Sequence, residues 1–166
     1  MIAFWAALAV AVPDGAWAID AQFKGRRERS LDEPGCAWER TTLRWTAAAT
    51  LVVRQDRLCA DRAGWVARWS EVEVPIQWVD AQRYEVPHEG AGAIDVTVLR
   101  TVTNGAVRGH ASRTWRVTAE VLTEGGLLEP DGDRMRLHTD TKEGLVLVAA
   151  PVEPDWAAVR ASVVAD

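Results

Sequence analysis

Alternating apolar and polar side chains run through much of the chain. From Leu43 to Val53 the odd positions are apolar and include Trp45, while most even positions carry Thr or Arg. Successive side chains of a β-strand point to opposite faces of a sheet. This segment therefore predicts one strand with a buried face, and it places the Trp45 ring in the core.

Two later segments repeat this pattern. The residues from Arg113 to Thr123 alternate as regularly, with Trp115 on the apolar side. Those from Ile94 to Thr103 also alternate, and the dipeptide Asn104–Gly105 that follows is typical of a tight hairpin turn. Both segments are predicted to be strands, and Trp115 is predicted to be a core residue.

The region between these strands changes its parity. Trp65 and Trp69 are apolar at odd positions, whereas Val72 and the apolar residues after it are even. A change of face near Ser70 predicts a β-bulge or a sharp bend. Pro75 lacks a backbone N–H, so it indicates an edge strand or the start of a strand.

The last part of the chain predicts two strands and a helix. Arg134 to His138 alternate, Leu145 to Ala150 are all apolar, and the residues from Asp140 to Gly144 between them resemble a hairpin loop. Asp155 is a suitable N-cap for a short helix that reaches Val164. Together with the earlier strands, the pattern predicts an all-β fold. We expect an antiparallel β-sandwich or small barrel of about six to eight strands, with a short C-terminal helix.

The N-terminal segment resembles an export signal. Ile2 to Val12 carry no charge, and Pro13 and Gly15 separate this run from the small-x-small sequence Ala16–Ala18. The run is shorter than the roughly 20 apolar residues that span a bilayer. We therefore expect a cleaved segment 1–18 and a single β-rich domain 19–166, secreted or periplasmic. No Lys or Arg precedes the run, so a retained element packed in the fold, or a membrane anchor, is the alternative; the protein would then be cytoplasmic or membrane-anchored.

The cysteine pair agrees with export. Cys36 and Cys59 are the only two cysteines, and neither belongs to a CxxC motif. In an oxidising compartment such a pair is expected to form a disulfide. Two reduced, buried thiols in a cytosolic protein are the alternative.

Composition excludes several classes of protein. A chain of 166 residues with 48% hydrophobic and 26% charged content is typical of one globular domain. A net charge of −5 argues against a general nucleic-acid binder, which needs basic residues to neutralise phosphates. One basic cluster opposes this balance and indicates either a membrane-surface contact or a solvated segment: Lys24, Arg26, Arg27 and Arg29.

Familiar catalytic and metal-binding motifs are missing from the sequence. There is no GxSxG, Walker or HExxH motif, since Gly92 stands where the second His of the last would follow His88. The three histidines are widely separated, and the acidic residues from Asp131 to Asp133 fit an ordinary turn better than a calcium loop. We therefore predict no cofactor and no metal.

The candidate binding site is the segment from Trp78 to Gly92. It is the longest stretch without a clear strand pattern, and loops on a rigid β scaffold commonly carry function. Tyr and Arg are also enriched where proteins bind one another. The predicted binding residues are Trp78, Arg83, Tyr84, His88 and Glu89.

Export, β structure and missing catalytic motifs together favour a binding function. We expect a non-enzymatic module that binds a protein partner or a surface, as an adaptor or a subunit of an envelope or extracellular assembly. The nine Trp residues, against one Tyr and two Phe, support an alternative in which exposed Trp rings bind a small ligand or a glycan. The third possibility is an enzyme whose site is assembled across strands.

Overall fold

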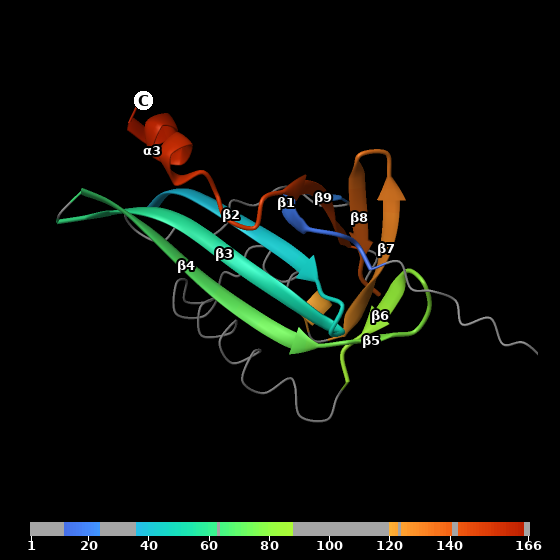
Figure 1. Ribbon diagram of the computed structural model, residues 1–166. Helices are drawn as coiled ribbons and strands as arrows, with labels where there is room; N and C mark the ends of the chain where they lie inside the picture. The colour runs from blue at the N-terminus through green and yellow to red at the C-terminus, as the bar shows by residue number, and fades with distance from the viewer. Residues whose placement is uncertain are drawn as a thin grey trace, which may run out of the picture.

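In the computed structural model, the described residues form one antiparallel sheet, a C-terminal helix and a short helical segment at residues 120–122 (Figure 1). It describes residues 12–23, 36–62, 64–87, 120–122, 124–140 and 143–164. Within these ranges nine strands pair in the order β4-β3-β2-β1-β9-β8-β7-β6-β5. The elements are β1 (Ala16–Phe23), β2 (Cys36–Trp45), β3 (Thr50–Asp61), β4 (Gly64–Pro75), β5 (Gln77–Trp78), β6 (Arg83–Glu85), β7 (Gly125–Asp131), β8 (Arg134–His138), β9 (Gly144–Ala150) and α3 (Trp156–Val164).

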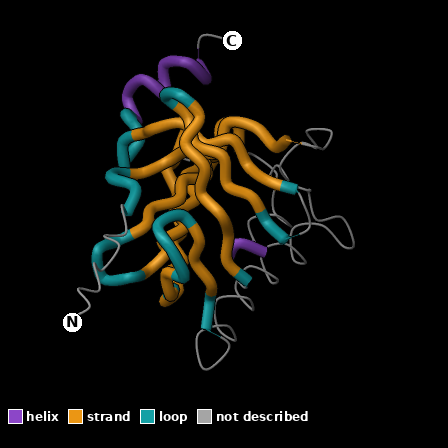
Figure 2. Tube along the Cα trace, turned by 90° about the vertical axis from the view of Figure 1, so that its right-hand side faces the viewer, coloured by secondary structure: helices purple, strands orange, loops and turns teal. Residues whose placement is uncertain are grey.

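The sheet curls into a half-barrel. In Figure 1, β7 and β8 run at a steep angle to the long strands β3 and β4, and Figure 2 shows α3 at one end of the strands. The predicted antiparallel β fold with a short C-terminal helix is confirmed. The apolar side chains of one face form the core together with Val121 and Leu122 of the helical segment 120–122. Its other fully buried members include Leu43, Leu51, Val74, Tyr84, Leu137, Leu145 and Leu147.

The alternating segment from Leu43 to Val53 is not one strand but the tip of the β2–β3 hairpin. Trp45 lies opposite Leu51 in the ladder, and Ala49 in the connecting loop has a φ of 56°. A short loop with one left-handed residue is a common hairpin connection. Because cross-strand partners share a face, the odd positions of both strands face the core, and the alternation continues through the turn. Trp45 is only 3% exposed, as predicted.

Strand β4 (Gly64–Pro75) is regular, so the predicted bulge near Ser70 is wrong. One register with β3 holds along the whole strand. Val74 is buried in the core, whereas Trp65 and Trp69 point to the other face and are 37% and 60% exposed. The proline that ends β4 agrees with its place at the edge of the sheet.

A disulfide joins β2 to β3. Cys36 and Cys59 are directly opposite in the ladder, and their sulfur atoms are bonded. The predicted pairing is confirmed, and it closes the β2–β3 hairpin at the end away from its loop. No free cysteine remains, because these two are the only ones in the chain.

The N-terminal strand lies inside the sheet, between β2 and β9. β1 pairs with β9 over most of its length, but with β2 only through Trp17 and Ala18. Ala16 and Ala18 are buried. Cleavage after Ala18 would therefore remove every residue of β1 that pairs with β2. Removal of residues 1–18 stays a prediction.

The C-terminal elements follow the sequence pattern closely. β8 and β9 occupy the two predicted strand segments, and α3 begins directly after Asp155. The Asp155 carboxylate accepts hydrogen bonds from the backbone N–H groups of Ala157 and Ala158, both at 3.1 Å, so it caps the helix as expected. Gly132, with a φ of 65°, turns the chain between β7 and β8, which confirms the turn expected there. No helix within the described ranges is long and apolar enough to cross a membrane.

Several sequence predictions fall outside the described residues. These are the strand from Ile94 to Thr103, Trp115, and the basic cluster between Lys24 and Arg29. Of the strand predicted up to Thr123, only residues 120–122 are described, and they are helical, so the prediction is wrong at those three positions.

Candidate functional site

One face of β2, β3 and β4 carries Trp and charged side chains beside the buried apolar residues Val52 and Leu58. Arg40 on β2 lies opposite Asp56 on β3, which in turn lies opposite Trp69 on β4. Cross-strand partners share a face, so these three side chains form a row on the side of the sheet away from the core. We call this surface the Trp–Arg face and define it by Trp38, Arg40, Arg54, Asp56, Trp65 and Trp69.

A buried carboxylate organises the Trp–Arg face. Asp56 is fully buried and accepts two charged hydrogen bonds, from Arg40 Nη2 at 3.1 Å and from Arg54 Nε at 2.8 Å. An isolated buried charge is very unfavourable, whereas one that is paired and hydrogen-bonded is tolerated. The guanidinium groups of Arg40 and Arg54 therefore stabilise the buried Asp56 charge, and Asp56 fixes the positions of both groups.

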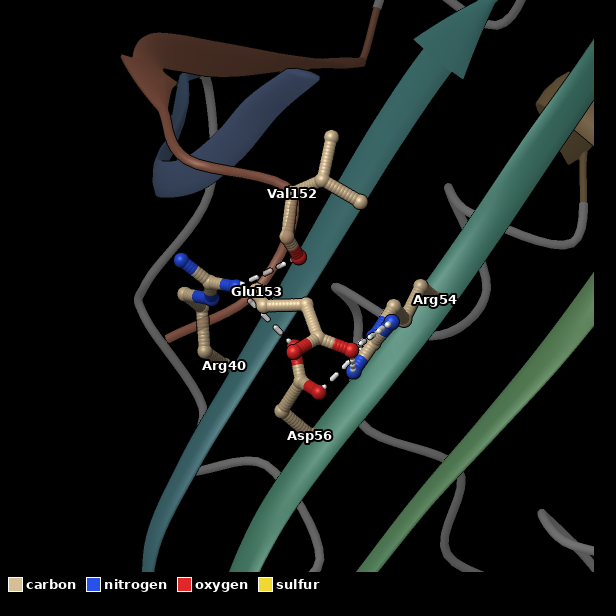
Figure 3. Close-up of polar contacts among 5 residues, drawn as sticks. All are labelled: Arg40, Arg54, Asp56, Val152 and Glu153. Carbon is tan, nitrogen blue, oxygen red and sulfur yellow. Dashed lines mark hydrogen bonds and ion pairs between the residues drawn. The ribbon is translucent and has the colours of Figure 1, made fainter. Parts of the chain in front are cut away.

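The C-terminal segment completes this cluster. The Val152 carbonyl oxygen accepts a hydrogen bond from Arg40 Nη2 at 3.0 Å, and Glu153 Oε1 lies 3.5 Å from Arg54 Nη2. Figure 3 shows this segment crossing β2, with the Glu153 side chain pointing toward Arg54. The Glu153 carboxylate pairs with the Arg54 guanidinium group. Together with the hydrogen bond from Arg40, this contact holds the segment before α3 against the sheet.

Trp69 rests on this ion cluster. The Arg54 guanidinium carbon lies 4.7 Å from the centre of the Trp69 ring, within the range of a cation–π contact. Arg54 cannot easily move, since Asp56 and Glu153 bind its nitrogen atoms. Trp69 therefore has an ordered support on one side and remains exposed to solvent. Trp65 projects from the same strand on the same face.

Trp38, a member of the Trp–Arg face, packs against a Trp ring at the border of this face. Trp38 on β2 and Trp156 at the start of α3 pack edge to face, with ring centres 5.8 Å apart. Both are half-buried. Edge-to-face packing is a favourable geometry for aromatic rings, so this pair helps to fix α3 beside β2.

The predicted site between Trp78 and Gly92 has a different structure. Residues His88 and Glu89 lie outside the described ranges, and the preceding part contains strands β5 and β6 in place of an open loop. Tyr84 is completely buried, and its ring contacts Trp78, with ring centres 5.6 Å apart. Arg83 is partly exposed, and its Nη1 atom lies 3.6 Å from Asp140 Oδ1. Trp78 and Tyr84 are thus brought together in the core, and Arg83 is not. Binding by this segment stays a prediction.

Local contacts explain how this region is held. Burial raises the pKa of the Tyr84 phenol far above its usual range, and its hydroxyl donates to the Val121 carbonyl at 3.4 Å. Two backbone N–H groups, of Gln82 and Arg83, donate to Asp80 and lower the pKa of that carboxyl.

A polar cavity of about 550 Å³ lies beside β6, lined in part by Arg83, Glu85, Glu124 and Asp140.

Sequence reasoning missed the Trp–Arg face. It treated Trp65 and Trp69 as buried and inserted a change of face to explain them. The sequence did contain a signal for this face. Val72 and Val74 stand at even positions, so in a regular strand the odd positions, which include Trp65 and Trp69, lie on the opposite face. Among the described residues no group of three or more His, Cys, Asp or Glu side chains is placed to hold a metal ion.

Comparison with known proteins gives no further guide to the site. No protein-family model, no curated protein and no solved structure matches this chain.

Proposed function

We propose that this protein is a non-enzymatic, exported binding module that contacts a protein partner through the Trp–Arg face. The observation that carries this proposal is the exposure of Trp65 and Trp69 on one face of a single strand, with Trp69 supported by Arg54. Trp and Arg are enriched among the residues that dominate the energy of protein interfaces. An anchor that is already ordered also loses less conformational entropy on binding.

Export is supported by the disulfide. Cys36 and Cys59 are bonded, and disulfides persist mainly in oxidising compartments. The proposed role, as an adaptor or a subunit of an envelope or extracellular assembly, follows from export together with an exposed aromatic surface.

The proposal is tested by affinity capture with matched variants. Wild-type protein, the double variant Trp65→Ala/Trp69→Ala and the control Val79→Ala are used as baits against the envelope and culture-medium fractions of the source organism. Val79 is 54% exposed but does not belong to the Trp–Arg face. We expect a protein that is captured by wild type and by the control and lost from the double variant. Capture that is equal with all three baits would exclude the Trp–Arg face.

Glycan binding is the second candidate function, and the spacing of the two Trp rings favours it. Four residues along a strand separate Trp65 from Trp69 by about 13 Å, on the same face. Both rings offer a flat apolar surface. An oligosaccharide long enough to span this distance could stack two non-adjacent sugar rings on them. Binding of oligosaccharides of increasing length by wild type, but not by Trp69→Ala, would favour a glycan ligand over a protein partner.

A further inference from the structure

Strand β4 is a long free edge within the described part of the chain. It stands first in the strand order and pairs only with β3 there, although it is 12 residues long. The opposite edge, β5, has only two residues. An edge strand presents a row of backbone N–H and C=O groups that can pair with another chain. β4 therefore offers the larger template for an added strand.

On the Trp–Arg face, the exposed side chains of β4 change from aromatic to acidic along the strand. Trp65 and Trp69 occupy its first half, and Glu71 and Glu73 follow on the same face, both exposed. Neither carboxylate forms an ion pair with another described residue. An added strand would thus meet two aromatic rings and then two exposed carboxylates that have no ion pair among the described residues.

We propose that β4 binds an extended segment of the protein partner as an additional antiparallel strand. The partner segment carries β-branched residues opposite Trp65 and Trp69, and Lys or Arg opposite Glu71 and Glu73. Aromatic–β-branched pairs and opposite charges are the cross-strand pairs that stabilise antiparallel sheets. Main-chain hydrogen bonds provide affinity in this mode of recognition, and alternate side chains provide specificity. This inference rests on the proposed function and names how the partner is held.

Charge disfavours a second copy of this chain in the register centred on Glu71. Antiparallel pairing of two β4 strands about Glu71 would set that carboxylate against the same carboxylate of the other copy. Like charges directly opposite one another destabilise a sheet. A basic segment instead neutralises Glu71 and Glu73, so it is the favoured occupant.

A designed peptide tests the proposal on the full-length protein. The peptide Lys-Thr-Lys-Thr-Val-Glu-Thr-Thr-Val, with blocked ends, places Lys opposite Glu73 and Glu71 and Glu opposite Arg68 in an antiparallel register. The control peptide exchanges Lys and Glu throughout. Calorimetry measures affinity, and amide hydrogen exchange measures protection along residues 65–73. We expect the first peptide to bind at least about tenfold more tightly than the control, equivalent to about 1.4 kcal/mol, and to protect amides of β4.

A charge-exchange variant makes the test specific. In Glu71→Lys/Glu73→Lys the preference for the two peptides should reverse. In Glu71→Gln/Glu73→Gln, whose side chains are nearly the same size, it should fall to the smaller part that Arg68 contributes, because Arg68 still favours the Glu of the first peptide. Circular dichroism checks that both variants fold. Absence of binding, binding without protection of β4, or a preference that ignores these substitutions would overturn strand addition. A dimer that protects β4 without peptide would identify a second copy as the occupant and would also overturn it. If a partner still depends on Trp65 and Trp69 while the peptide fails, the proposed function stands and only strand addition is wrong.

Discussion

The Arg54 guanidinium contacts the Trp69 ring at 4.7 Å while its Nε atom donates to the buried Asp56 carboxylate at 2.8 Å. One side chain thus connects a fully buried charge to a largely exposed aromatic ring. The position of the exposed Trp69 ring therefore depends on the ion cluster around Asp56. Substitutions of the buried ion cluster and of the exposed Trp rings are expected to change stability by different amounts.

Loss of the buried carboxylate should destabilise the fold. Asp56→Ala leaves two guanidinium groups without their shared partner, and breaking a buried ion pair in this way costs about 3 to 5 kcal/mol. Urea unfolding measures the change. Asp131→Ala is the matched control, because its pair with Arg136 is about half exposed and such pairs contribute about 1 kcal/mol or less. Equal losses in the two variants would contradict the role given to Asp56.

Two Trp substitutions should separate core from surface. Trp45→Ala removes a ring that is buried in the core and should lower the free energy of unfolding by about 3 to 5 kcal/mol. Trp69→Ala removes an exposed ring with one cation–π contact and should cost about 1 kcal/mol. Guanidinium unfolding compares the two directly. A larger loss for Trp69→Ala would show that the two faces of the sheet have been assigned wrongly.

Reduction of the disulfide should weaken the domain without changing its fold class. Cys36 and Cys59 are separated by 23 residues, and the loop-entropy relation gives a stabilisation of about 3 kcal/mol for such a closure. Unfolding with and without reductant measures the difference, and intact mass should rise by about 2 Da on reduction. Cys36→Ala/Cys59→Ala is the control, since reductant should not affect it. Native protein with two alkylatable thiols would contradict the disulfide.

A glycine beside the buried Tyr84 should tolerate no side chain. Gly125 has a φ of 114°, and a Cβ atom there would lie 2.1 Å from the Tyr84 carbonyl oxygen. Backbone strain and overpacking together should make Gly125→Ala less stable by about 3 kcal/mol or more. Gly132→Ala provides the comparison, because its φ of 65° is also left-handed but no atom lies within 4 Å of the added Cβ. Thermal unfolding should show a small loss for Gly132→Ala, and equal losses would contradict the close contact.

The N-terminal strand provides a test of the predicted cleavage. A chain that begins at Ile19 lacks Trp17 and Ala18, the residues that join β1 to β2, and should unfold at a lower denaturant concentration than one that begins at Pro13. Intact mass of the exported protein identifies its natural first residue. If the Ile19 form is as stable as the longer form, the β1–β2 pairing contributes little.

Sequence alone determined the features that depend on local geometry. Side chains alternate along any strand, so the pattern identified β8 and the burial of Trp45 without knowledge of the neighbouring strands. The helix cap at Asp155 is also local, because the carboxylate bonds N–H groups two and three residues ahead. With only two cysteines, the sequence allowed a single disulfide pairing, and the structure decided between that bond and two reduced thiols.

The tertiary structure decided which face of each strand is covered and which distant residues meet. The alternation from Leu43 to Val53 has the same parity on both sides of the hairpin loop, so it contains no sign of the turn. Trp69 is exposed because the core of β4 lies on the other face, although Trp itself is suited to either environment. Arg54 and Glu153 are 99 residues apart in sequence and meet only because the C-terminal segment crosses the sheet. Periodicity describes one strand at a time, whereas burial and ion pairing depend on what packs against it.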